Sequence, residues 1–193
     1  MVKAHQDDSI LCRRGVRRYN YVRSFWACGD PEPESWHVRS VWVYRNDLNW
    51  VEMGWCKGYE CGPHESEWVH PYAFKAWKIN GVYGEEEFKM LPPPSRHYFN
   101  VNNPYYNYRW KFWLDGTYYG PDLVHWYMNE GEVGGQSEVH EIREGAYTRW
   151  WGLQLRTSLG WADWYRLECM LPDSNPDWKC QKISNTEFKV VRE

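Results

Sequence analysis

Two short stretches of the sequence carry side chains suited to acid-base chemistry on a polar bond. Residues 49–55, Asn-Trp-Val-Glu-Met-Gly-Trp, place Glu52 in a run that otherwise has the composition of a buried strand. Residues 134–140, Gly-Gly-Gln-Ser-Glu-Val-His, place Gln136 and Glu138 behind two glycines. Two carboxyl groups a few ångströms apart do not both ionise readily, so one keeps a proton while the other activates water. Where glutamine replaces one carboxyl, its amide can donate to a developing oxyanion while the remaining glutamate acts as general base.

Either scheme requires the two stretches to meet on one face of a sheet. Successive side chains of a strand point to opposite faces, so Trp50, Glu52 and Gly54 share a face. By the same alternation, Gln136 and Glu138 share one side of their own strand. A glycine beside the acid leaves room for a ligand backbone. We therefore predict that Glu52 faces a groove together with Gln136, Glu138 or both, and these three residues are the catalytic candidates.

The pattern of the whole chain favours β-strands. Short runs of Val, Trp and Tyr alternate with polar residues and are interrupted by Gly, Pro, Asn and Asp. About ten such strands predict an all-β fold, a two-sheet antiparallel β-sandwich of jelly-roll or concanavalin-like type. The length of 193 residues suits a single domain. Met-Leu-Pro-Pro-Pro-Ser at residues 90–95 predicts a stiff crossover between the two sheets.

Within this domain we assign residues 38–193 to the sandwich and residues 1–37 to an N-terminal arm or edge strand. Five arginines lie between Cys12 and Cys28, which is typical of an exposed, disulfide-linked segment. A basic patch that binds an acidic polymer is the alternative interpretation of this segment.

The clearest predicted hairpin spans residues 105–120. Asp115 and Gly116 suit a two-residue turn with positive φ. Pro71, in an earlier run, is predicted to end or bulge its strand. Alternation along the hairpin predicts five core side chains: Tyr106, Tyr108, Trp110, Phe112 and Leu114.

The six cysteines are grouped in local pairs along the sequence. Six cysteines allow about 15 connectivities, but loop-closing pairs suit an exported protein in an oxidising compartment. The predicted disulfides are Cys12–Cys28, Cys56–Cys61 and Cys169–Cys180.

A zinc site is the competing interpretation of the middle pair. Cys56, Cys61, His64 and His70 offer thiolate and imidazole ligands, but their spacing, broken by Pro63, does not match a zinc finger. We expect neither a metal nor another cofactor.

Charge and hydropathy exclude several classes of protein. The formal net charge of -3 and a pI near 6.2 give no basic footprint for a phosphate backbone, so nucleic acid is not an expected partner. No run of about 18 apolar residues predicts a membrane span. Residues 1–10 lack the apolar segment of a signal peptide. The cysteines alone therefore predict an extracellular location, with the signal peptide absent from this chain.

The 15 Trp and 15 Tyr residues are the most unusual feature of the composition. These side chains combine a flat apolar body with one polar atom, so they serve binding faces as well as partly wet cores. The predicted partners are a carbohydrate or a protein surface, with self-association as a further option. The candidate ligand-binding residues are Trp50, Trp68, Tyr72 and Trp77.

Three stretches in this order resemble a family: residues 51–55, the hairpin at 110–120, and residues 134–140. They are similar to secreted concanavalin-like, jelly-roll β-sandwich proteins, including neprosin-type glutamic peptidases and uncharacterised bacterial relatives. In the neprosin-type enzymes one catalytic Glu precedes a Gly-Trp pair, which Glu52 matches. The other follows a Gly-Gly pair, where this sequence has Gln136, with Glu138 two residues further on. A Gln/Glu pair occurs in the fungal glutamic peptidases, so the resemblance still implies a hydrolase.

Three functions remain open from the sequence. The first is an extracellular binding or adhesion module whose aromatic side chains contact a carbohydrate or protein ligand. The second is a glutamic-peptidase-like hydrolase that uses Glu52 with Gln136 or Glu138. The third is a structural subunit of an extracellular assembly. Composition favours the binding module, and the sequence leaves open whether the chain is an enzyme.

Overall fold

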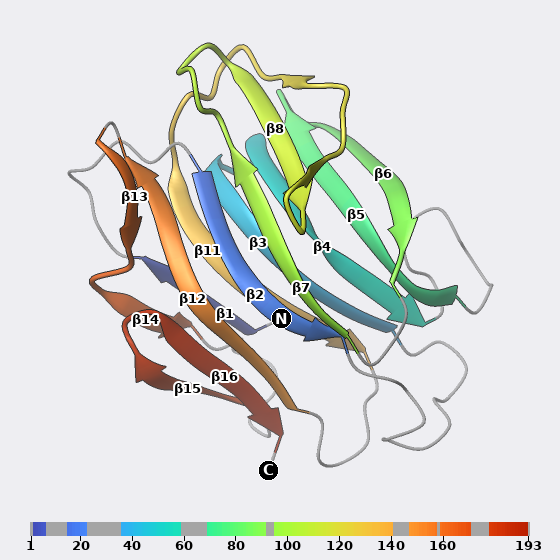
Figure 1. Cartoon of the computed structure of the whole chain (residues 1–193), viewed down its shortest axis with the longest axis vertical. Helices are drawn as coiled ribbons and strands as arrows, with labels where there is room; N and C mark the ends of the chain where they lie inside the picture. Colours follow the sequence, from blue (N-terminus) through green and yellow to red (C-terminus); the bar gives the residue numbers. More distant parts are fainter. Residues whose placement is uncertain are drawn as a thin grey trace.

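The computed structural model describes residues 2–6, 15–22, 36–58, 69–91, 95–140, 147–157, 159–170 and 178–192. These residues form sixteen β-strands and no helix. The strands are arranged as two antiparallel sheets packed face to face, which confirms the predicted all-β sandwich (Figure 1). No part of the described chain forms a helix able to cross a membrane.

The smaller sheet has seven strands in the order β14-β1-β11-β3-β4-β5-β6. Their bounds are β1 Val2–Gln6, β3 Trp36–Asn46, β4 Asn49–Gly58, β5 Val69–Ile79, β6 Val82–Met90, β11 Glu132–His140 and β14 Leu167–Met170. The larger sheet has nine strands in the order β10-β8-β7-β2-β12-β16-β15, with β9 paired to β8 and β13 paired to β12. Their bounds are β2 Gly15–Val22, β7 Ser95–Asn102, β8 Arg109–Leu114, β9 Thr117–Tyr118, β10 Leu123–Val124, β12 Tyr147–Thr157, β13 Gly160–Asp163, β15 Trp178–Ser184 and β16 Glu187–Arg192.

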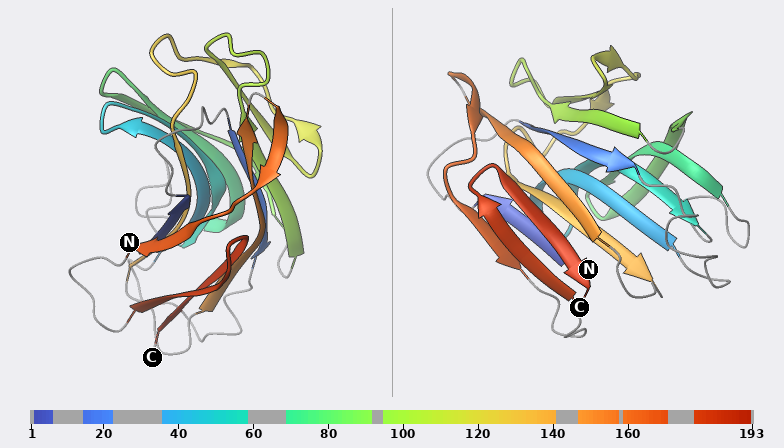
Figure 2. Two further views of the ribbon diagram at one scale, coloured as in Figure 1. Left: turned by 90° about the vertical axis from the view of Figure 1, so that its left-hand side faces the viewer. Right: turned by 60° about the horizontal axis from the view of Figure 1, so that its bottom comes forward.

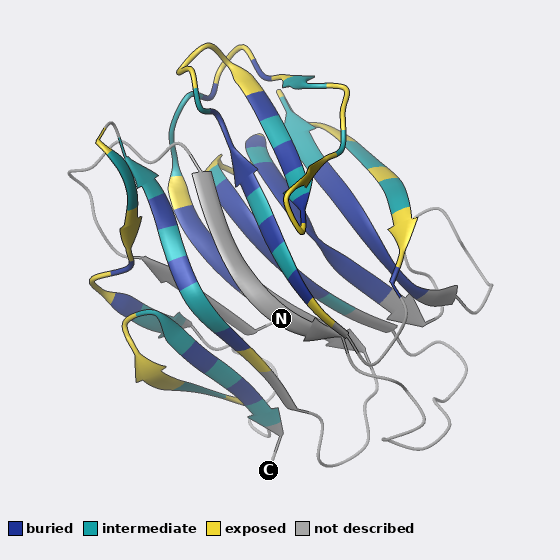
Figure 3. Cartoon of the chain, viewed as in Figure 1, coloured by how far each residue is buried: buried dark blue, intermediate teal, exposed yellow. Residues whose placement is uncertain are grey.

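The hydrophobic core fills the space between the two sheets. Alternate side chains of several strands enter it, for example Val51, Met53 and Trp55 of β4 and Trp110 and Phe112 of β8. Figure 3 shows this alternation as buried and less buried bands along β8 and β12. The period-two patterning of the sequence therefore sets the two faces of each sheet.

Two cationic side chains lie within this core. The Arg39 guanidinium is 5.9 Å from the ring centroid of Trp55 and 6.0 Å from that of Trp150. The Lys75 ammonium is 3.0 Å from a carboxylate oxygen of Glu86. Each buried charge is thus compensated, by ring faces or by an ion pair, as low-polarity surroundings require.

Two tight hairpin turns fix the registers around the core. Asp115 and Gly116 have φ of 52° and 80°, which confirms the predicted two-residue turn. Asn80 and Gly81, with φ of 51° and 83°, join β5 to β6 in the same way. Asn and Gly tolerate the left-handed conformation that such turns require.

A β-bulge lies in β5 at Pro71. Cys56 pairs with Tyr72 but Gly58 pairs with Val69, so β5 carries one extra residue between these pairs. Pro71 cannot donate to a ladder, and its carbonyl accepts a 2.7 Å hydrogen bond from the Leu91 amide. The predicted bulge is therefore confirmed.

The hairpin prediction for residues 105–120 is correct only in its second half. Trp110, Phe112 and Leu114 are fully buried, as alternation predicts. Tyr106 and Tyr108 are exposed, and the prediction that they belong to the core is wrong. Their φ values of 53° and 61° place them in the left-handed region, so strand alternation does not apply until β8 begins at Arg109.

The described parts of the N-terminal segment do not lie at the edge of a sheet. Residues 15–22 form β2, which pairs with β7 on one side and β12 on the other. Residues 2–6 form β1, which lies between β11 and β14 in the other sheet. The predicted edge position is therefore wrong, because pairing with distant strands decides the place of a strand and the local arginine content does not.

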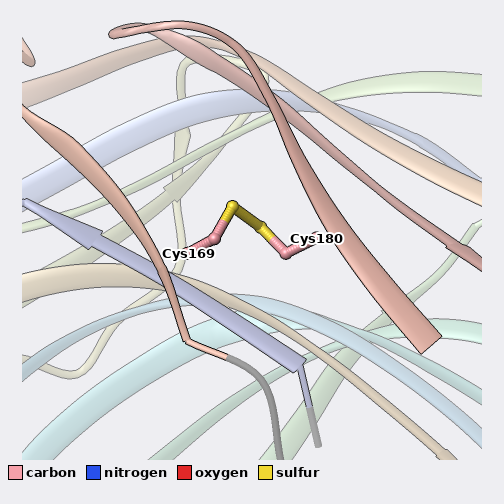
Figure 4. Close-up of a disulfide and its surroundings, with 2 residues drawn as sticks. All are labelled: Cys169 and Cys180. Carbon is pink, nitrogen blue, oxygen red and sulfur yellow. A yellow bond between two sulfur atoms is a disulfide. The ribbon is translucent and has the colours of Figure 1, made fainter. Parts of the chain in front are cut away.

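The sequence predicted two of the links between the sheets. The chain passes from β6 in the smaller sheet to β7 in the larger one, so the predicted crossover at residues 90–95 is confirmed. The predicted Cys169–Cys180 disulfide is also confirmed: it links β14 to β15, with a Cα–Cα distance of 5.6 Å (Figure 4). Cys56 is disulfide-bonded as well. Cys12, Cys28 and Cys61 lie outside the described residues, so the other two pairings stay predictions.

Candidate functional site

Glu52 lies on the outer face of the seven-stranded sheet. Its strand neighbours Val51 and Met53 face the core, while Trp50 and Cys56 belong to a second cluster on the opposite face. Glu52 shares that outer face by alternation and is only 8% exposed. Figure 2 shows that the strands of this sheet are strongly bent, with the outer face on the inner side of the bend.

The register across β11, β3 and β4 places positions 52 and 136 on this same face. Directly paired residues of antiparallel strands project to the same side, so each set of pairs forms a row across the sheet. The Glu52 row consists of Gly134, Trp42, Glu52, Ala76 and Glu85, from β11 to β6. The Gln136 row, adjacent to it, consists of Gln136, Ser40, Gly54, Phe74 and Glu87.

The register also ranks the two candidate partners of Glu52. With strand spacings of about 4.8 Å and a rise of about 3.4 Å per residue, the Cα atoms of Glu52 and Gln136 are about 12 Å apart. Glu138 pairs with Val38 one row further on, at about 17 Å from Glu52. By this backbone register, position 136 is the nearer of the two to Glu52.

Small residues separate Glu52 from the position of Gln136. Ser40 and Gly54 pair with each other in the Gln136 row. A Cβ atom added at Gly54 would lie 2.0 Å from the Arg39 carbonyl oxygen, so the backbones approach too closely there for any other residue. The Ser40 hydroxyl is buried and has no hydrogen-bond partner among the described residues. Ser40 and Gly54 therefore contribute only small groups to this face, and Ser40 itself is fully buried.

The Trp42 side chain lies between Glu52 and β11. Its indole ring lies over Gly134, where an added Cβ would be 2.0 Å from Cζ2 and 2.2 Å from Cε2. It also contacts Tyr44 edge-on, with ring centroids 6.0 Å apart. The glycine at position 134 thus makes room for the ring that helps to bury Glu52.

Glu85 is a carboxyl group on this face that the sequence reasoning missed. It ends the Glu52 row, and the Tyr83 hydroxyl donates a hydrogen bond to it. Burial raises the pKa of Glu85, the Glu87 charge adds to the increase, and the Tyr83 hydrogen bond opposes it. The Asn80–Gly81 turn was the signal that could have found it, because a two-residue turn pairs Ile79 with Val82 and so sets this register.

The four predicted ligand-binding aromatics do not gather on one surface. Trp50 is half-buried on the outer face, 5.9 Å from the ring of Tyr83. Tyr72 is buried on the same face, and burial followed by the charge of nearby Glu87 raises its pKa above the usual range. Trp77 packs against the core from the inner face. Trp68 lies outside the described residues.

No group of three or more His, Cys, Asp or Glu side chains is placed to hold a metal ion in the described part of the chain. Cys61 and His64 fall outside that part, so the zinc alternative stays untested.

No protein-family model matches the sequence, and no curated protein matches it either. Solved structures do match the fold. A scytalido-glutamic peptidase with a peptide-based transition-state analogue superposes with a TM-score of 0.70 at 7% identity, covering 100% of this chain and 98% of that chain. SCP-B, a member of the eqolisin family of peptidases in complex with the tripeptide Ala-Ile-His, gives a TM-score of 0.64 at 7% identity over the same shares.

A weaker match is CG-16, a homodimeric agglutinin from chicken liver, with a TM-score of 0.41 at 12% identity, covering 74% of this chain and 98% of that chain. At these identities the likeness concerns the fold alone. The chain therefore has the concanavalin-like β-sandwich architecture that glutamic peptidases also have.

Proposed function

We propose that this protein is an acid hydrolase of the glutamic-peptidase type, with Glu52 as general base and Gln136 as oxyanion donor. The observation that carries the proposal is the register, which puts Glu52 and Gln136 in adjacent rows of one sheet face with Ser40 and Gly54 between them. The match to glutamic peptidases along the full length of both chains supports the same architecture for the site.

The proposed chemistry uses a glutamate and a glutamine in complementary roles. Glu52 takes a proton from water, and the resulting hydroxide attacks the carbonyl carbon of a peptide bond. The Gln136 amide donates a hydrogen bond to the oxyanion of the tetrahedral intermediate. Glu52 then returns its proton to the leaving nitrogen as the C–N bond breaks, which yields a carboxylic acid and an amine.

This assignment implies activity in acid. Glu52 can take a proton from water only while it is ionised, so its protonation sets the acid limb of the activity profile. We therefore expect activity to appear as the pH rises through the range in which glutamates titrate, about pH 2 to 6. An extracellular location accords with the Cys169–Cys180 disulfide, since such bonds persist in oxidising compartments.

The test is cleavage of acid-denatured haemoglobin by the folded protein between about pH 2 and 6, the range in which glutamates titrate. Glu52→Gln removes the base while keeping the shape of the side chain, and we expect a loss of at least about 100-fold. Gln136→Ala should lose about 100- to 1,000-fold, as removal of an oxyanion donor does.

Glu138→Gln is the matched control, because it removes a carboxyl from the same strand one row further from Glu52. We expect its activity to stay within about threefold of the wild type. No cleavage by folded wild-type protein, or full activity in Glu52→Gln, would refute the proposed function. A loss in Glu138→Gln equal to that in Glu52→Gln would contradict the choice of Gln136.

A further inference from the structure

A row of aromatic side chains lies on the outer face of the other sheet, away from the Glu52 site. Trp113 of β8 pairs directly with Tyr118 of β9, and their ring centroids are 5.8 Å apart. The Lys111 ammonium is 5.3 Å from the Tyr118 ring and 5.7 Å from the Tyr105 ring. These four residues, called the β8 aromatic row, form a continuous chain of contacts.

Both tyrosines of the β8 aromatic row are exposed to solvent, while Lys111 and Trp113 are half-buried. Tyr105 is 71% and Tyr118 43% exposed, and Figure 3 shows exposed segments in the loops that flank β8. Between residues 103 and 130, the only exposed large aliphatic side chain is Val124, at 36%. The exposed apolar side chains here are thus almost all aromatic.

The loop that presents Tyr105 is held in a strained shape. The two tyrosines that follow it in the sequence, at positions 106 and 108, have positive φ, a conformation that bulky residues rarely adopt. Asn129 restrains the loop: its side-chain oxygen accepts a 2.7 Å bond from the backbone amide at position 108 and a 3.0 Å bond from the Asn103 amide. Strain held by surrounding structure is characteristic of functional segments.

The charges along the β8 aromatic row cancel. Lys111 forms an ion pair with Asp122 at 3.3 Å, and the Tyr118 hydroxyl donates a hydrogen bond to the same carboxylate. Partial burial and this hydrogen bond raise the pKa of Tyr118 to about 12, so its phenol is neutral at physiological pH. Asn100 of β7 pairs with Trp113 of β8 and adds an uncharged amide beside the rings. Such a surface suits a neutral ligand and gives no attraction for a polyanion.

We propose that the β8 aromatic row binds a neutral carbohydrate chain. The face of a sugar ring is lined with C–H groups that stack on the electron-rich face of an aromatic ring. The hydroxyl groups at the rim of the sugar can bond to the Asp122 carboxylate and the Asn100 amide. The three rings, of which Tyr105 and Tyr118 are joined through Lys111, offer more than one stacking position to the sugar units of a polymer. This binding site does not depend on the proposed hydrolase activity.

The test is affinity electrophoresis of the folded protein in native gels that contain xylan, β-glucan or galactomannan, with polygalacturonate as the anionic comparison. We expect at least one neutral polymer to retard the wild type. The Tyr105→Ala and Tyr118→Ala double variant should bind about tenfold more weakly. Tyr105→Ala alone, at the most exposed position of the row, gives a smaller loss and keeps the result readable if the double variant unfolds.

Tyr165→Ala is the matched control, because Tyr165 is 47% exposed between β13 and β14 and lies outside the row. It should be retarded like the wild type. The proposal is overturned if no neutral polymer retards the wild type, if only polygalacturonate does, or if Tyr105→Ala and the double variant bind as well as the wild type while folded.

Discussion

Gly134→Ala tests the packing of the Trp42 ring over Gly134, beside Glu52. The added Cβ would lie 2.0 to 2.5 Å from three ring carbons of Trp42, whereas carbon atoms in contact are about 3.5 to 4.0 Å apart. The ring must therefore move by about 1.5 Å or the two strands must separate. Overpacking of this kind costs about 1–3 kcal/mol, so we expect the free energy of unfolding to fall by that amount.

The assay is urea denaturation monitored by fluorescence. It compares the wild type, Gly134→Ala, Trp42→Leu and the double variant that carries both changes. Leucine lacks all three of the ring atoms that the new Cβ would meet. Gly134→Ala should then cost less than about 0.5 kcal/mol in the Trp42→Leu background, because the clash is gone. If Gly134→Ala lowered the free energy of unfolding equally in both backgrounds, or not at all in the wild type, the packing of Trp42 over Gly134 beside Glu52 would be refuted.

Three further perturbations probe other parts of the fold. Trp110→Ala should lower the free energy of unfolding by about 3–5 kcal/mol in urea, since Trp110 is fully buried and donates a 2.9 Å bond to the Met128 carbonyl; an unchanged midpoint would contradict its core position. Burial lowers the pKa of His125, so the unfolded state binds the proton more readily and stability should fall as the pH drops below about 6.5; His125→Gln should flatten this dependence in thermal melts, and an unchanged slope would count against it. Gly116→Ala should cost about 1 kcal/mol by the same urea assay, because φ is +80° and nothing lies within 4 Å of the added Cβ, so backbone strain is its sole source; a neutral effect would argue against the two-residue turn.

The sequence predicted the faces of single strands well, because alternation is a local property. It placed Glu52 and Gly54 opposite Val51 and Met53, as the structure does. Alternation also explains why two of the predicted ligand-binding aromatics lie on opposite faces of the sheet. Tyr72 and Trp77 are five residues apart in β5, and an odd separation within one strand places them on opposite faces.

Partners across the sheet were beyond the reach of local patterns. Glu52 and position 136 lie in adjacent rows only because β3 pairs with β11, a strand that follows it about ninety residues later in the chain. No short-range signal encodes that pairing. Lysine is ordinarily a surface residue, but Lys75 lies in the core beside Glu86, since the β5–β6 register brings the two together. The left-handed tyrosines before β8 show the same limit: loop geometry overrides alternation.

The most direct test of the central claim is a double-mutant cycle on kcat/KM for one peptide substrate at acidic pH. Groups that act as a unit on one transition state give strongly non-additive losses. If Glu52 and Gln136 act together, the Glu52→Gln and Gln136→Ala double variant should lose little more activity than Glu52→Gln alone. Losses that multiply would show that the two residues act independently, and a folded wild-type protein without any turnover would contradict the shared site altogether.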